Sequence, residues 1–235
     1  MKQKHTSIRI GIASLLLGLA LSATTASAQH IHAGAFSTAQ DSQLYFTDGA
    51  SFINTSGYVK TLPFASTGTF AGLYNGGLTF VAASSDPMRG SDYSPNHAAL
   101  GSFLELRLET VISGPDGGEF AFWQSGVQQT SLGVGDTGTF QLDLSDAANG
   151  AGMPLNDPYG HLHGQRRWTA TERGVYDVGF RIVDTSVNGV GGGPIHTPSD
   201  LFVIRFEAVP EPGTTALIGV GALGAAVMAW RRRKA

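Results

Sequence analysis

The sequence predicts an all-β protein whose main domain is an antiparallel β-sandwich, and three observations support this class. Several segments alternate apolar and polar residues with a period of two, which is typical of strands with one buried and one solvated face. The chain holds 32 glycines in 235 residues, placed among β-branched and aromatic residues without a short repeat, which favours many turns between short strands. Between residues 29 and 208 no segment shows a convincing period of 3.6 residues. Short strands separated by turn signals are typical of a sandwich.

The first 28 residues have the three parts of a secretory signal peptide. A basic start is followed by a short apolar stretch over residues 10–21 and by the small-residue cleavage site Ala26-Ser27-Ala28. We therefore predict a signal helix over residues 1–28, which is removed on export. The mature chain is expected to begin at Gln29.

Strand signals follow one another along residues 29–208, the predicted ectodomain. In chain order the weaker signals lie at residues 43–47, 57–62, 69–74 and 78–82, and the stronger ones at 104–109, 120–123, 140–144, 176–182 and 202–206. The segment Gly114-Pro115-Asp116-Gly117-Gly118 is a turn signal between a strand that ends near Ile112 and the aromatic run at 120–123.

Three segments between the strands are predicted to be long loops. Residues 86–96 and 147–160 are polar and rich in turn-forming residues, and residues 189–193 are mostly glycine. Long loops on a rigid sheet scaffold are where binding sites tend to lie. We therefore expect a functional site at one of these loops.

The C-terminal segment 209–235 predicts a membrane-spanning helix. Pro210-Glu211-Pro212 is followed by an uncharged run over residues 213–230 and by a basic end over residues 231–234. Such a run is just long enough to cross a bilayer core as a helix. Basic residues directly after it favour retention on the cytoplasmic side. One interpretation of this pattern is a plain C-terminal membrane anchor.

A sharper interpretation follows from the order of the three features. Pro-Glu-Pro, an apolar helix and an arginine cluster at the C-terminus resemble the PEP-CTERM sorting signal of Gram-negative bacteria. The residues that carry this resemblance are Pro210, Glu211, Pro212, Arg231, Arg232 and Arg233. It implies that an exosortase-type membrane enzyme recognises and removes the tail. It also implies a protein held in the inner membrane before processing and located at the cell surface or in the extracellular matrix afterwards.

The predicted ectodomain is acidic and contains no cysteine. It carries 17 Asp and Glu against 8 Lys and Arg, a formal charge of −9, whereas the whole chain carries −3. Such a surface argues against nucleic acid or anionic lipid as partners and is compatible with cations. The absence of cysteine excludes disulfides and thiolate metal sites.

Histidine is the residue type that points to a site. The ectodomain histidines are His30, His32, His97, His161, His163 and His196, and four of them form two His-x-His pairs. Residues i and i+2 of a strand point to the same face, so the two imidazoles of a pair can converge on one ion. Two such pairs would supply four nitrogens for tetrahedral zinc. A histidine pair that is simply solvated is the alternative interpretation.

The segment around the second pair resembles the choice-of-anchor M domain, a family of bacterial surface domains. The features shared with that family are Gly160, His161, His163, Trp168, Gly174 and Tyr176, together with the opening pair His30 and His32, the step Gly114-Pro115 and the aromatic strand 120–123. The resemblance covers nearly all of residues 29–208. The chain departs from the family's pattern at residues 164–167, where the step between histidine and tryptophan is longer.

The chain is also similar to a smaller group of PEP-CTERM proteins whose genes are controlled by a zinc-responsive repressor. Domains of this kind accompany metal-uptake transporters. The resemblance therefore implies zinc as the cofactor, metal storage, buffering or delivery as the function, and a metal-uptake system as a partner. The ligand chemistry alone does not select zinc, because imidazole also suits copper and nickel.

Further ligand candidates lie near the predicted strand ends. His196 stands just before the last strand and is favoured over His97 as an additional ligand. Asp157 and Asp200 are possible oxygen ligands, or acceptors for the N–H groups of the histidine ligands.

The sequence does not indicate an enzyme. It lacks the His-Glu-x-x-His, Gly-x-Ser-x-Gly and phosphate-loop motifs, and Glu172 is too far from the second histidine pair to be named as a base. A cupin-type arrangement would require an acid where Arg167 stands. The main alternative to metal binding is a structural or glycan-binding module of the extracellular matrix. In that case Trp123, Trp168, Tyr93 and Tyr159 would stack on sugars. The other interpretation of these aromatic residues is packing in the core, which is preferred for Trp123.

Overall fold

The computed structural model describes residues 30–47, 51–52, 59–145, 157–161 and 166–210. The predicted signal helix 1–28, the predicted spanning helix 213–230, the basic end and His163 lie outside these residues. Within the part of the chain that is described, no helix is long and apolar enough to cross a membrane.

The described residues fold mainly into β-strands, as predicted. The strands are β1 (His30–Ala35), β2 (Leu44–Phe46), β3 (Ser51–Phe52), β4 (Lys60–Pro63), β5 (Tyr74–Gly76), β6 (Thr79–Ala82), β7 (Leu104–Ser113), β8 (Glu119–Gln124), β9 (Val127–Gly133), β10 (Gln141–Asp143), β11 (Gly160–His161), β12 (Arg166–Ala170), β13 (Gly174–Asp184) and β14 (Phe202–Val209). One short 3-10 helix, η2 (Pro87–Asp92), lies between β6 and β7.

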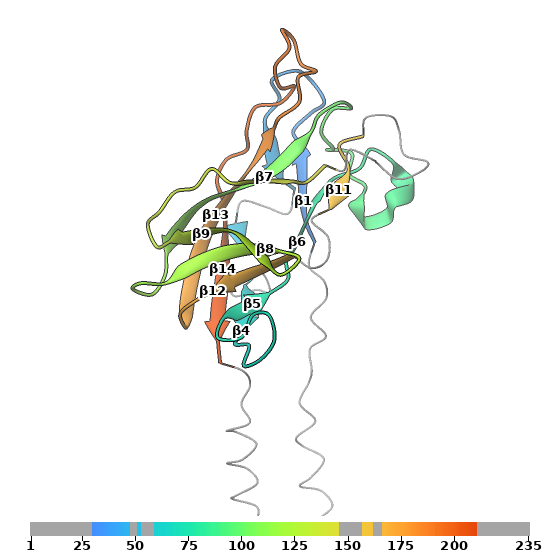
Figure 1. Ribbon diagram of the computed structural model, residues 1–235. Helices are drawn as coiled ribbons and strands as arrows, with labels where there is room; N and C mark the ends of the chain where they lie inside the picture. The colour runs from blue at the N-terminus through green and yellow to red at the C-terminus, as the bar shows by residue number, and fades with distance from the viewer. Residues whose placement is uncertain (1–29, 48–50, 53–58, 146–156, 162–165, 211–235) are drawn as a thin grey trace, which may run out of the picture.

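The strands form three sheets (Figure 1). The first sheet has the order β11-β6-β1-β2. It carries His30 and His32 on β1 and His161 on β11. The central sheet has the order β10-β7-β13-β14-β3, with β4 also paired to β14. The third sheet has the order β5-β12-β8-β9.

The strand pairing differs from a purely antiparallel sandwich. β1 pairs with β6 in parallel, and β14 pairs in parallel with both β3 and β4. The long strands β7, β13 and β14 are antiparallel to one another, as their clear alternation predicted. The parallel pairs arise because β1 and β14 stand beside strands that are distant in the sequence, so no hairpin dictates their direction.

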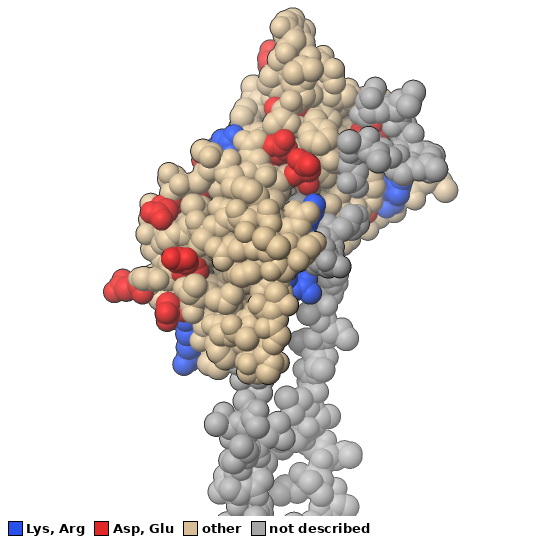
Figure 2. Space-filling model, in the orientation of Figure 1, with Lys and Arg blue, Asp and Glu red and all other residues tan. Residues whose placement is uncertain are grey.

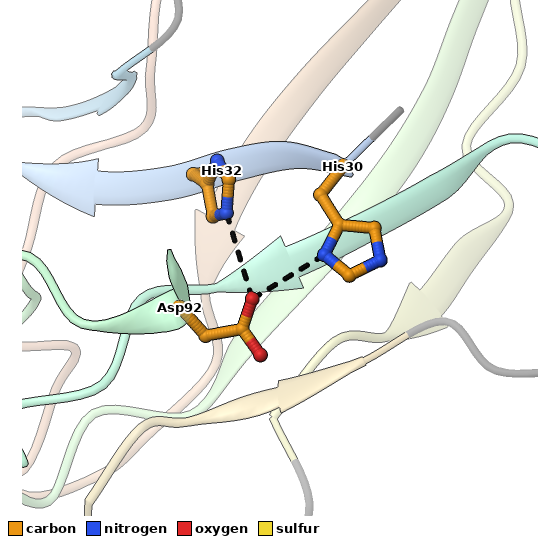
Figure 3. Close-up of side chains that lie close together, drawn as sticks. All are labelled: His30, His32 and Asp92. Atoms are coloured by element: carbon orange, nitrogen blue, oxygen red, sulfur yellow. Dashed lines mark hydrogen bonds and ion pairs between the residues drawn. The ribbon is translucent and has the colours of Figure 1, made fainter. Parts of the chain in front are cut away.

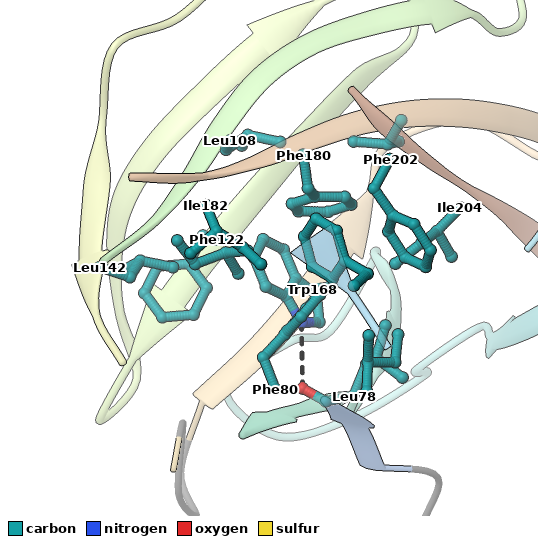
Figure 4. Close-up of a cluster of buried hydrophobic side chains, with 14 of the residues drawn as sticks. Leu78, Phe80, Leu108, Phe122, Leu142, Trp168, Phe180, Ile182, Phe202 and Ile204 are labelled. Atoms are coloured by element: carbon teal, nitrogen blue, oxygen red, sulfur yellow. Dashed lines mark hydrogen bonds between the residues drawn. The ribbon is translucent and has the colours of Figure 1, made fainter. Parts of the chain in front are cut away.

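Aromatic side chains fill the core between the sheets (Figure 4). Trp168 of β12 is 1% exposed, and its ring lies 4.9 Å from that of Phe122 and 5.2 Å from that of Phe180, measured between centroids. Its indole N–H donates to the Leu78 carbonyl oxygen at 3.3 Å, which satisfies the one polar atom of the ring. The third sheet is thereby packed onto the central sheet and onto Phe80 of the first sheet.

Some local predictions were wrong. Residues 69–73 form turns, and the strand there is limited to β5 (Tyr74–Gly76). β9 and β12 were not predicted as strands, because β9 is mostly polar and exposed and β12 lacks clean alternation. The loop predicted over residues 86–96 contains η2.

An ion pair on the solvent face of the central sheet makes stability depend on pH. Arg205 Nε donates to Asp177 Oδ1 at 2.8 Å across β13 and β14. The hydrogen bond from Arg205 holds the pKa of Asp177 below its usual range. A lowered carboxyl pKa in the folded state adds stability above the unfolded-state pKa, about 3.9, and this stability is lost as the pH falls through the folded-state pKa.

We expect Asp177→Asn to lower the urea midpoint at pH 7 and to reduce the loss of stability between pH 4 and pH 2. The measurement is urea unfolding of both proteins at a series of pH values. Asp116→Asn, in the turn between β7 and β8, is the control and should follow the parent protein. Parallel pH curves for the parent and Asp177→Asn would contradict the assignment.

Candidate metal centre

The first two ligand candidates lie on β1, where the alternation of the strand places them on one face. His30 and His32 point away from the core, while Ile31 and Ala33 between and after them are buried in it. β1 is held on both sides, by β6 in parallel and by β2 antiparallel. The backbone that carries the histidine pair is therefore fixed by the sheet.

The third candidate is Asp92, the last residue of η2. Asp86 begins this helix by accepting a hydrogen bond from the backbone N–H of Met88 at 2.9 Å. Ser84, just after β6, donates its backbone N–H to the Asp92 carbonyl oxygen at 2.8 Å. This bond fixes the end of η2 close to β6, the strand that neighbours β1.

Asp92 and the histidines of β1 converge (Figure 3). Asp92 Oδ1 lies 3.3 Å from His30 Nδ1 and 3.7 Å from His32 Nε2, and one ligand atom from each of the three residues lies within 4.8 Å of the others. Ligand atoms of tetrahedral zinc, at about 2.0–2.1 Å from the ion, are separated by about 3.4 Å. The three side chains thus stand close to the spacing that one ion requires.

His161 contacts the other oxygen of the same carboxylate. Its Nε2 atom lies 3.0 Å from Asp92 Oδ2, and the Tyr159 hydroxyl donates to the same oxygen at 3.2 Å. In the first sheet His161 and His32 are both in register with Val81 of β6, one on each side. Residues directly opposite in a sheet share a face, so the two histidines flank Asp92 across one strand.

The centre is partly shielded from water. The side-chain exposures are 32% for His30, 18% for His32, 13% for Asp92 and 9% for His161. One edge of His30 therefore remains open to solvent, while the other groups are largely covered. An ion can enter from the His30 side.

The carboxylate of the centre is prepared for cation binding. Burial acts to raise the pKa of Asp92, but the charge of His161 and the hydrogen bonds with His30 and Tyr159 outweigh it and hold the pKa below its usual range. Asp92 is therefore ionised at neutral pH. An anionic oxygen beside imidazole nitrogens is a donor set that zinc accepts.

Hydrogen bonds of Asp157 hold the segment that carries Tyr159, a partner of Asp92. Asp157 Oδ2 accepts hydrogen bonds from Ser85, from the hydroxyl at 2.7 Å and from the backbone N–H at 3.1 Å, and Asp157 Oδ1 accepts one from the Tyr159 backbone N–H at 2.9 Å. The guanidinium of Arg89 lies over the Tyr159 ring at 4.7 Å from its centroid. Asp157 thus joins the segment directly before β11 to Ser85 in the loop before η2.

The structure brings His30, His32 and His161 together but not His196. His196 is 2% exposed, its Nε2 accepts the Ala99 backbone N–H at 2.9 Å, and its Nδ1 lies 2.9 Å from the Ser42 carbonyl oxygen. Both ring nitrogens thus hold the backbone together in another part of the domain. His163 lies outside the described residues.

The remaining sequence candidates have other contacts. His97 Nδ1 lies 2.7 Å from the Ala98 carbonyl oxygen, and Asp200 accepts from Gln43 Nε2 at 3.1 Å. Asp157 supports the centre and is not one of its ligands. Among the aromatic residues expected to stack on sugars, Trp168 belongs to the core.

Sequence reasoning missed Asp92. The residue lies in the loop 86–96, one of the loops predicted to carry a site, but its partners His30 and His161 lie 62 and 69 residues away on either side. An acidic residue in a polar loop is not distinguished by local pattern from its neighbour Asp86, which begins η2.

Comparison with known proteins identifies the C-terminal segment. Residues 208–234 match the family model described as the PEP-CTERM protein-sorting motif. No curated protein and no solved structure matches the chain. The match confirms the sorting signal predicted from the order of its three features. The chain is therefore an exported protein that carries a PEP-CTERM motif, the signal for exosortase processing and for sorting to the cell surface.

Proposed function

We propose that this exported protein binds one zinc ion at the cell surface and stores, buffers or delivers it to an uptake system. His30, His32 and Asp92 are the proposed ligands, and His161 holds the second oxygen of Asp92. The observation that carries the proposal is the convergence of these side chains from β1, η2 and β11. Three separate chain segments bring these ligand atoms to one point.

Charge supports a cation as the ligand. Acidic side chains are spread over the face shown in Figure 2, whereas basic side chains stand singly near its margins. The ectodomain carries the formal charge of −9 given above. A net negative charge of this size favours cations over anions as ligands of the ectodomain.

The number of ligands suits transfer of the ion. Three protein ligands leave one position of tetrahedral zinc for water or for a ligand from an acceptor protein. His161 contacts the second oxygen of Asp92 and orients this ligand, as hydrogen-bonded groups around metal ligands commonly do. We propose binding rather than catalysis, because the sequence carries no catalytic motif. The preference for zinc over copper rests on the resemblance to PEP-CTERM proteins whose genes are controlled by a zinc-responsive repressor.

Metal content of the purified protein tests this proposal. We expect about one equivalent of zinc per chain when the exported protein is purified without a His-tag and in the absence of chelator, measured by mass spectrometry of the elements. Apoprotein titrated with zinc should reach the same stoichiometry. A chain that takes up no equivalent of zinc, copper or nickel would remove the proposed function.

The sorting motif gives a second expectation, which concerns processing. β14 ends at Val209 and is paired there with Pro63 of β4, so the domain is complete directly before Pro210-Glu211-Pro212. Removal of the tail near these prolines therefore leaves the last strand whole.

We expect peptide mapping of cell-surface protein to recover β14 and no peptides from residues 213–231. In a host strain without the exosortase, the peptides from residues 213–231 should be recovered from the inner membrane. Recovery of these peptides from surface-released protein would show that the tail is retained.

A further inference from the structure

A pocket lies away from the metal centre, between β2 and the start of β14. Its volume is about 300 Å³, and it is lined by Phe36, Gln43, Leu44, Tyr45, Phe46, Thr47, Ser199, Asp200, Leu201 and Phe202. This volume is at the lower end of the range of small-molecule sites, about 300–1,000 Å³. The pocket is therefore large enough for a small ring and too small for a folded partner.

One wall of the pocket is a stacked aromatic pair on the surface. The rings of Phe36 and Tyr45 are nearly parallel, with an interplanar angle of 5° and a centroid separation of 4.4 Å. Phe36 follows β1 directly and is 64% exposed. One face of the Phe36 ring is covered by Tyr45, and the exposure of the side chain leaves its other face available to a ligand.

Part of the pocket rim beside the aromatic pair is polar. Gln43 Nε2 donates to Asp200 Oδ1 at 3.1 Å, which holds an amide and a carboxylate side by side at the mouth. Within the described part of the chain, Asp200 Oδ2 and Gln43 Oε1 accept no hydrogen bond in the structure. Two neighbouring acceptors of this kind fit two adjacent hydroxyl groups, and the charged oxygen strengthens such a bond.

The backbone around the pocket is rigid. Phe36 donates its backbone N–H to the Gln43 carbonyl oxygen at 3.1 Å, and Leu44 donates its N–H to the Thr197 carbonyl oxygen at 3.0 Å. The rings of Phe46 and Phe202, which also line the pocket, are stacked with their centroids 4.1 Å apart. The backbone that carries the aromatic wall and the polar rim is thus held in place before any ligand binds, which lowers the entropic cost of binding.

From this geometry we propose that the pocket binds one ring of a neutral polysaccharide. A pyranose ring has an apolar face of C–H groups and an edge of adjacent hydroxyls. The first matches the exposed face of Phe36, and the second matches the acceptors of Asp200 and Gln43. The ring is neutral, because Asp200 and the acidic ectodomain would repel a uronic acid or a sulfated sugar. The site is independent of the metal centre, so it does not rest on the proposed metal binding.

The test is calorimetric titration of the exported protein in the presence of EDTA. The probes are hexasaccharides of β-1,4-glucose, β-1,3-glucose, β-1,4-mannose and N-acetylglucosamine, with a galacturonic acid hexamer as the acidic comparison. We expect at least one neutral hexamer to bind and the acidic hexamer to bind at least tenfold more weakly.

Three variants assign the binding to this pocket. Phe36→Ala should weaken the binding of the neutral hexamer at least tenfold, and Asp200→Asn should weaken it severalfold. Phe70→Ala removes another phenylalanine that is only partly buried but lies outside this pocket, and it should leave the affinity unchanged. Thermal unfolding of each variant checks that the fold is retained.

Failure of every neutral hexamer to bind at millimolar concentration would overturn the proposal, as would unchanged affinity in Phe36→Ala or a preference for the galacturonic acid hexamer. Because the titrations contain EDTA, none of these outcomes depends on whether the metal centre is real.

Discussion

Replacing both histidines of β1, as His30→Ala with His32→Ala, is expected to abolish stoichiometric zinc binding. The double variant removes two of the three proposed ligands and leaves Asp92 with His161 alone, which is too few donors for tight zinc binding. Both side chains point away from the core, so the apo fold should survive the change. The measurement is zinc content after equilibration with a small excess of metal.

The same variant should lose the stabilisation that zinc provides. An ion that binds only the folded state adds about 2.7 kcal/mol to the free energy of unfolding at a hundredfold excess over its dissociation constant. We therefore expect zinc to raise the melting temperature of the parent protein and not that of the double variant. The measurement is thermal unfolding with zinc and with EDTA.

Two matched variants separate the centre from the other histidines. His97→Ala removes a histidine whose ring contacts the Ala98 carbonyl oxygen, and it should keep full zinc content. His161→Ala with His163→Ala removes the group that positions Asp92 and should weaken binding less than loss of the β1 pair. If both double variants still hold one equivalent of zinc, the ion is bound elsewhere and the matrix-module alternative gains support.

Acid should release the ion, and the reason lies in the histidines. Because the pKa of Asp92 is held below its usual range, the carboxylate remains charged well below neutral pH. Imidazole must be neutral to bind zinc, so protons compete with the ion and affinity is expected to fall as the solution is made acidic. Asp92→Asn should weaken binding at pH 7.5 but preserve this pH dependence, since the histidines remain.

The alternation of residues made the central sheet predictable and left the first sheet less so. β7, β13 and β14 show the pattern over many residues, and each was predicted at nearly the right place. β2 and β6 lie within the weaker signals predicted at residues 43–47 and 78–82, but β11 has two residues, which is too short for a period to be seen. The pairing of β11 with β6 depends on a contact between distant segments, which local sequence does not encode.

The residues of the candidate site likewise fall into those that the sequence could predict and those that it could not. His30 and His32 could be predicted because a strand places i and i+2 on one face, and His161 could be predicted from the second His-x-His pair. Asp92 could not, because its position depends on a 3-10 helix that a β-bridge between Ser84 and Tyr93 holds beside β6. His196 was favoured for its place before the last strand, yet burial and two backbone hydrogen bonds occupy its ring.

The largest loss of stability is expected from Trp168→Ala. The ring is almost fully buried between the sheets, against Phe80, Phe120, Phe122 and Phe180. Its removal leaves a cavity that these rings cannot fill and deprives the Leu78 carbonyl oxygen of its indole partner. Replacing a buried tryptophan by alanine costs about 3–5 kcal/mol. For a domain of this size we expect the melting temperature to fall by about 10 °C.

Trp123→Ala is the matched control, because it removes the same side chain from the same sheet. Trp123 is only partly buried, its ring meets Phe70 edge-on, and its N–H donates to the Thr169 hydroxyl at 2.8 Å. Its loss should cost clearly less than that of Trp168. Urea unfolding of both variants measures the difference in the free energy of unfolding. A tryptophan whose main role is to stack on sugars would be cheap to remove, so a small loss in Trp168→Ala would contradict the packing described here.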